Sequence, residues 1–159
     1  MYKGYFNDDL EFHGHGELTF RGEKFVGTFN KGKLVGYGTF MNSVEKYDGY
    51  FVAGKRQGYG TTVLKNKISI TGYWEDNVPS GEATVKDEQG TVITTGKWEK
   101  GFYLEKGEGS KSTTFEYIFS GTLLMHTEEK GKNDKIVKET ISVPALFVKE
   151  DKSVPALSS

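Results

Sequence analysis

The 159-residue chain is glycine-rich, nearly neutral and free of cysteine. It holds 21 glycines, 21 basic and 22 acidic residues, with a formal net charge of −1. A nucleic-acid partner calls for a strongly basic face, so we expect none here. The lack of cysteine excludes a disulfide framework and a thiolate metal site, and no apolar run reaches membrane-spanning length. We therefore expect a cytoplasmic protein with no metal and no cofactor.

A short aromatic motif recurs five times in the first hundred residues. Each copy carries a glycine between two larger residues, and successive copies begin 22 to 24 residues apart. Larger residues two apart lie on one face of a strand, so each motif predicts a β-strand. A regular period of this size is typical of a repeat array. The copies are Tyr2-Lys3-Gly4-Tyr5-Phe6, Phe25-Val26-Gly27-Thr28-Phe29, Tyr47-Asp48-Gly49-Tyr50-Phe51, Ile70-Thr71-Gly72-Tyr73-Trp74 and Thr94-Thr95-Gly96-Lys97-Trp98.

A turn and a second strand follow the motif, so each copy is predicted to be one β-hairpin. Turn residues such as Asn30-Lys31-Gly32-Lys33 come first, and a Gly-x-Gly sequence then opens the second strand. One hairpin alone is marginal in water, so we expect successive hairpins to lie side by side. The regular glycines suggest close approach of a neighbouring aromatic ring or a bend in the sheet. The Gly-x-Gly sequences are Gly14-His15-Gly16, Gly36-Tyr37-Gly38, Gly58-Tyr59-Gly60 and the degraded Gly81-Glu82-Ala83.

This spacing of aromatic residues, turn and glycines closely resembles the MORN repeat (membrane occupation and recognition nexus). The best copy runs from Phe25 to Phe40, and the resemblance covers residues 2 to about 100. It implies an all-β fold: an elongated, single-layer, twisted antiparallel sheet of stacked β-hairpins, with a partner-binding groove on one face. The copies that begin at Ile70 and Thr94 lack the leading aromatic residue. We expect those two repeats to lead towards a β-rich C-terminal cap.

The chain is predicted to divide into an array at 1–105, divergent capping strands at 106–141 and an extended tail at 142–159. Within the tail the pentapeptide Ser-Val-Pro-Ala-Leu occurs twice, eleven residues apart. Proline favours an extended residue before it, so each copy could lie along a groove or sheet edge, and two copies could act as a bivalent ligand. Alternatively, one copy packs on the parent sheet and the other is a frayed terminus. The tail motif residues are Val143, Pro144, Leu146, Val154, Pro155 and Leu157.

Two sets of aromatic residues are expected on different faces of the array. The ladder at the motif ends, from Tyr2 and Phe6 to Trp74 and Trp98, is predicted to form the packing face. The tyrosines beside the repeat glycines are predicted to bind a peptide or helix of a protein partner, because tyrosine gives a large amphipathic contact at little entropic cost. Ordinary cross-strand packing is the alternative. This predicted binding set is Tyr5, Tyr37, Tyr50, Tyr59 and Tyr73.

A second hypothesis is binding to an anionic phospholipid surface. Basic residues in the turns of neighbouring repeats could meet head groups, at about 1 kcal/mol each. Acidic residues occupy the equivalent turns of flanking repeats, so the basic patch is only two repeats wide. The residues concerned are Lys31, Lys33, Lys55 and Arg56.

Catalytic and metal sites have little support in the sequence. There is no Gly-x-Ser-x-Gly elbow and no phosphate-binding loop, and carboxylates such as Asp8 and Asp76 fall in predicted turns. His13-Gly14-His15 is favoured as a structural element rather than a metal site. We therefore expect a non-enzymatic interaction module, acting as an adaptor, scaffold or inhibitor. The strand that begins at Tyr2 leaves an open edge, which could form a homodimer.

Overall fold

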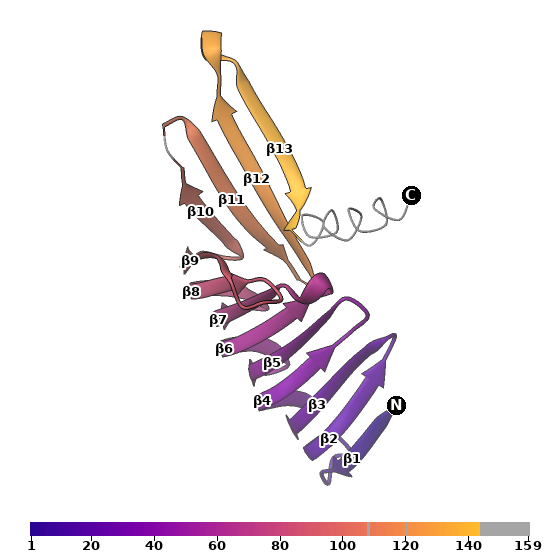
Figure 1. Cartoon of the computed structure of the whole chain (residues 1–159). Coiled ribbons are helices and arrows are strands. Elements are labelled where there is room, and N and C mark those ends of the chain that lie inside the picture. Colours follow the sequence, from indigo (N-terminus) through magenta and orange to yellow (C-terminus); the bar gives the residue numbers. More distant parts are fainter. Residues whose placement is uncertain (108, 120, 144–159) are drawn as a thin grey trace, which may run out of the picture.

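The computed structural model describes residues 1–107, 109–119 and 121–143, and these residues form an all-β fold of two antiparallel sheets (Figure 1). The first sheet has nine strands in chain order: β1 (Tyr2–Phe6), β2 (Phe12–Phe20), β3 (Glu23–Asn30), β4 (Lys33–Met41), β5 (Glu45–Val52), β6 (Lys55–Leu64), β7 (Ser69–Glu75), β8 (Val78–Lys86) and β9 (Val92–Trp98). The second has four: β10 (Phe102–Lys106), β11 (Lys111–Ile118), β12 (Thr122–Lys130) and β13 (Ile136–Ser142). Two 3-10 turns, η1 (Lys65–Lys67) and η2 (Lys132–Asp134), complete the described elements. The predicted fold class, a single-layer sheet of stacked hairpins followed by further strands, is confirmed.

Two-residue turns with left-handed backbone close several of the hairpins. Lys31 and Gly32 join β3 to β4 with φ of 49° and 87°, and Ala53 and Gly54 join β5 to β6 with φ of 49° and 82°. Positive φ at both central residues is the type I′ geometry, whose twist matches that of the flanking strands. The repeated turn therefore gives each of these hairpins the same local twist, and Figure 1 shows the nine strands as a twisted ladder.

The repeat glycines lie opposite one another beneath aromatic rings. Gly49 pairs with Gly60 across β5 and β6, and Gly60 pairs in turn with Gly72 on β7. A β-carbon on Gly49 would lie 2.5 Å from the Tyr47 hydroxyl oxygen and 2.5 Å from the Gly60 α-carbon. The close approach of an aromatic ring predicted from the sequence is confirmed here. The hydroxyl of Tyr47 donates a hydrogen bond across this glycine pair to the carbonyl of Tyr50.

The fifth hairpin is divided between the two sheets. A turn at Lys100 and Gly101, with φ of 48° and 88°, follows β9 just as in the earlier repeats. Only one bridge, between Glu99 and Phe102, then joins the two strands, and β10 pairs with β11 instead. The second sheet thus begins at Phe102, before the boundary at residue 105 that the sequence predicted.

Apolar residues of β11 and β12 pack against the C-terminal part of the first sheet, and Figure 1 shows the second sheet standing at the β9 end of the first. From β11, the Tyr117 ring meets Trp74 edge-on with centroids 5.2 Å apart, and Phe115 lies beside Trp98. Phe119, which follows β11, contacts Phe40. Backbone bonds add to this, since the Tyr117 amide donates to the carbonyl of Gly101 at 2.8 Å. The core therefore lies between the later repeats and β11–β12.

Candidate functional site

Four of the five predicted tyrosines form a row on the exposed face of the first sheet. Tyr37 on β4 is paired with Tyr50 on β5, and Tyr59 on β6 with Tyr73 on β7. Within each pair the rings meet edge to face, with centroids 5.4 Å and 5.5 Å apart. Their residues are between 49% and 61% exposed. The row of Tyr37, Tyr50, Tyr59 and Tyr73, called here the tyrosine row, crosses four consecutive strands.

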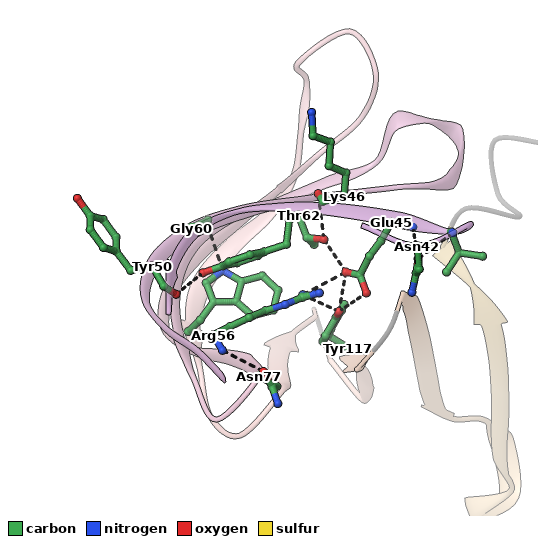
Figure 2. Close-up of polar contacts among 12 residues, drawn as sticks. Asn42, Glu45, Lys46, Tyr50, Arg56, Gly60, Thr62, Asn77 and Tyr117 are labelled. Atoms are coloured by element: carbon green, nitrogen blue, oxygen red, sulfur yellow. Dashed lines mark hydrogen bonds and ion pairs between the residues drawn. The ribbon is translucent and has the colours of Figure 1, made fainter. Parts of the chain in front are cut away.

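Alternation along each strand places the tyrosine row opposite the packed face. On β5, Tyr47, Gly49 and Phe51 are buried, whereas Tyr50 between them is exposed. Figure 2 shows Tyr50 projecting from one side of the sheet and Arg56 and Tyr117 lying on the other. These tyrosines are therefore not needed to fill the core between the two sheets.

The fifth predicted tyrosine, Tyr5, stands apart from the row. It is 73% exposed, but it lies on β1 and pairs with His13 rather than with another tyrosine. Strands β2 and β3 separate it from Tyr37, and they carry His15 opposite Thr28 at the equivalent position. The predicted set is thus two edge-to-face pairs on four consecutive strands and one isolated member.

Arg56 is buried, so the prediction that it faces a lipid surface is wrong. It is 1% exposed, and its side chain enters the space between the two sheets. Arg56 Nη1 donates to Glu45 Oε1 at 3.1 Å and to the Tyr117 hydroxyl at 2.9 Å, and its guanidinium carbon lies 4.5 Å from the centroid of the Tyr47 ring. The strand alternation that starts after the turn at Gly54 turns this residue inwards. Its charge is satisfied internally by a carboxylate and by aromatic faces.

The polar cluster of Glu45, Arg56, Thr62 and Tyr117 lies inside the core (Figure 2). Glu45 Oε1 accepts from Arg56 and Thr62, and the Tyr117 hydroxyl donates to both carboxylate oxygens of Glu45. Burial raises the pKa of Tyr117 well above its ordinary value; Arg56 opposes this shift and Glu45 adds to it. The cluster joins the sheets and has no exposed group through which to act on a substrate.

The remaining basic residues of the lipid hypothesis are exposed but only partly free. Lys55 forms an ion pair at 2.9 Å with Asp76, which lies in the neighbouring turn between β7 and β8. Lys31 and Lys33 are exposed at the turn between β3 and β4. The predicted basic patch therefore keeps Lys31 and Lys33 in one turn. In the other turn, Lys55 is paired with Asp76.

A cluster of partly exposed aromatic rings at the N-terminal end contains Tyr2 and Phe6, which the sequence predicts to belong to the packing face, together with Phe12. Tyr2 stacks on Phe12 with centroids 4.0 Å apart, and Phe6 meets both rings edge-on. Phe6 is 55% exposed, whereas Trp74 and Trp98, later in the same ladder, are buried. The second sheet covers only the later repeats, which leaves this part of the packing face open. The sequence signal is the aromatic ladder itself, but nothing in it marks where coverage ends.

The structure places one residue of the tail motif and both residues of the histidine motif. Val143 is fully buried and belongs to the core, whereas Pro144, Leu146, Val154, Pro155 and Leu157 lie outside the described residues. His13 and His15 are both exposed on β2. Across the described ranges, no group of three or more histidine, cysteine, aspartate or glutamate side chains comes together to hold a metal ion.

Comparison with known families supports the array assignment. The model of the MORN repeat family matches three consecutive segments, at residues 2–22, 25–42 and 47–67. These segments correspond to the hairpins β1–β2, β3–β4 and β5–β6. No curated protein matches the chain. Among residues 1–107, 109–119 and 121–143, no helix has the length and apolar character needed to cross a membrane.

Proposed function

Because the chain is a MORN-repeat protein, we propose that it is a non-enzymatic protein-interaction module that works in the cytoplasm as an adaptor, scaffold or inhibitor. MORN repeats are consistent with modules that bind proteins or membranes. The proposed contact surface is the tyrosine row, and the proposed partner is a peptide or helix of another protein.

The exposure of the tyrosine row is the observation that carries this proposal. Four large rings lie side by side on a face that the second sheet does not cover, each about half exposed. Tyrosine combines an apolar ring with a hydroxyl that can exchange water for a partner's polar group, and it is frequent among residues that dominate binding energy. Such a row offers both apolar area and hydrogen bonding without any rearrangement of the sheet.

The spacing of the row suits a short helix or an extended segment that lies across the strands. Neighbouring strands are about 4.8 Å apart, so four strands place the outer tyrosines about 14 Å apart. An α-helix rises about 5.4 Å per turn, so apolar side chains three or four residues apart recur at nearly the strand spacing. A helix of two to three turns could therefore place one apolar side chain beside each tyrosine.

Capture from native cell lysate, with identification by mass spectrometry, tests the proposal. The chain is compared with Tyr50→Ala/Tyr73→Ala and with Val92→Ala/Phe102→Ala, which removes exposed apolar surface elsewhere. A stoichiometric protein that is lost only with the tyrosine variant supports the tyrosine row. Equal capture by all three chains, or no captured protein, contradicts it. Thermal unfolding of each variant checks that the sheet is intact.

The phospholipid alternative and the homodimer each have a separate test. Sedimentation with anionic liposomes that is lost in Lys31→Glu/Lys33→Glu would favour a membrane-surface role through the turn between β3 and β4, whose two lysines are exposed. The homodimer is proposed at β1, which in the described structure pairs only with β2. Light scattering across the micromolar range should then show a dimer, and a strictly monomeric mass would exclude it.

A further inference from the structure

Strand β13 belongs to a sequence duplication longer than the pentapeptide. Residues 136–146 read Ile-Val-Lys-Glu-Thr-Ile-Ser-Val-Pro-Ala-Leu, and residues 147–157 read Phe-Val-Lys-Glu-Asp-Lys-Ser-Val-Pro-Ala-Leu. The two copies follow each other directly and agree at eight of eleven positions. The first copy contains the whole of β13, and the second lies outside the described residues. The duplicated unit is therefore an edge strand together with the residues that follow it.

The first copy pairs with β12 as the last strand of the second sheet. Along this edge Lys138 lies opposite Glu128, and Thr140 lies opposite His126, whose Nδ1 is 2.8 Å from the threonine hydroxyl. Ser142 pairs with Leu124 at the end of the strand. Val143 comes next and is fully buried in the core between the sheets. The unit thus supplies a ladder of backbone bonds and one buried apolar side chain.

We propose that the edge of β12 is a strand-binding site with two ligands in the same chain, and that residues 147–154 bind it when residues 136–143 leave. In the exchanged state the register, shifted by eleven residues, would place Lys149 opposite Glu128, as Lys138 is in the first copy. Asp151 would take the place of Thr140 and offer a carboxylate acceptor to His126. Val154 would take the place of Val143 in the core. This inference does not depend on the tyrosine row.

The differences between the copies make the first the preferred ligand. Ile141, which is half-buried opposite Met125, corresponds to Lys152 in the second copy. A lysine at this position would lose part of the apolar contact with Met125, and its alkyl chain would have to extend so that the ammonium group reaches water. Exchange also enlarges the loop after β12 to residues 131–146, although loop-closure entropy grows only slowly with length. The second copy is therefore a substitute of lower affinity, and its binding releases residues 136–143 without opening the core.

Substitution of Val143 and Val154 tests the exchange through non-additivity. Val154→Asp alone should leave the urea midpoint unchanged, because the first copy occupies the edge. Val143→Asp should lower the midpoint by less than half of the change in Val143→Asp/Val154→Asp, because the second copy rescues only the single variant. Additive effects, or a single Val143→Asp variant as unstable as the double variant, would overturn the proposal.

Cross-linking locates the substitute strand directly, because the chain has no native cysteine. Glu128→Cys/Lys149→Cys is introduced into the Val143→Asp background and treated with a short bis-maleimide, to which each of the two thiols adds. Opposed residues of an antiparallel pair have β-carbons about 5 Å apart, so a linked monomer is expected. Glu128→Cys/Lys138→Cys in the otherwise native chain is the matched control. Linked dimers would place the second copy on another molecule and overturn the intrachain site, as would the absence of any 128–149 link.

Discussion

Arg56 and Tyr117 are joined by a 2.9 Å hydrogen bond from one sheet to the other, although they lie 61 positions apart in the sequence. The tyrosine hydroxyl accepts this bond and donates another to Glu45. One phenol is therefore hydrogen-bonded to both the guanidinium and the carboxylate. Arg56 Nη2 is buried without a hydrogen-bond partner. The guanidinium lies against the rings of Tyr47, Trp74, Phe40 and Phe119, and this cation–π contact compensates part of that loss.

Tyr117→Phe should destabilise the protein although it removes only one oxygen atom. The Tyr117 hydroxyl donates a hydrogen bond to Glu45 Oε2 at 2.9 Å, and the Glu45 side chain is fully buried. Leaving a buried acceptor unpaired costs about 1–3 kcal/mol, and more when it is charged. Urea unfolding measures the change. Tyr103→Phe, which removes the hydroxyl of another half-buried tyrosine of the second sheet, should have little effect; equal losses in the two variants would contradict this account.

The free energy of unfolding should fall above about pH 10 because of two buried tyrosines. Burial raises the pKa of Tyr117 and of Tyr47 far above the ordinary value of about 10. Above pH 10 these groups lose protons in the unfolded chain while the folded chain keeps them. The stability that each tyrosine contributes is therefore complete below pH 10 and is lost as the pH rises towards its folded-state pKa, by at most about 1.4 kcal/mol per pH unit.

Urea unfolding at several alkaline pH values measures this slope. Tyr47→Phe and Tyr117→Phe should each flatten it, because phenylalanine has no proton to release from the unfolded chain. A slope unchanged in both variants would show that other groups cause the alkaline loss.

Gly49→Ala should be much more harmful than a glycine substitution in an open turn. The added β-carbon would lie 2.5 Å from the α-carbon of Gly60, so the backbone of β5 or β6 must move. Overpacking of this kind costs about 1–3 kcal/mol. At Gly131, where φ is −88°, the same change meets its nearest atom at 3.5 Å, so Gly131→Ala is the matched control. Thermal unfolding compares the two, and similar losses would contradict the role of close packing at Gly49.

The repeat array could be predicted from sequence because its signals are local. Each hairpin carries its own alternation, turn and glycines, so the exposure of Tyr50 beside the buried Tyr47 follows from the strand period alone. The burial of Arg56 could not be predicted in this way. An arginine just after a turn suggests a solvated side chain, and the residues that satisfy it, Glu45 and Tyr117, come from other strands.

The extent of the core also depended on an arrangement that no local pattern reveals. Phe6 and Trp74 occupy equivalent places in the repeat, yet only Trp74 is buried. The difference arises because β10 leaves the fifth hairpin and brings β11 over the later repeats. The sequence could therefore predict which face is apolar, but not which part of that face is covered.

Arg56→Met should be more harmful than the double replacement Arg56→Met/Glu45→Leu. The single change leaves the Glu45 carboxylate buried without its cation, which costs about 3–5 kcal/mol. Replacing both charges with apolar side chains removes that penalty, so the double variant should regain stability and the cycle should show a large coupling free energy. The exposed pair Lys55 and Asp76 provides the control, since its coupling should stay within about 1 kcal/mol. A double variant no more stable than Arg56→Met would mean that the aromatic contacts of the guanidinium, and not its pairing with Glu45, hold the two sheets together.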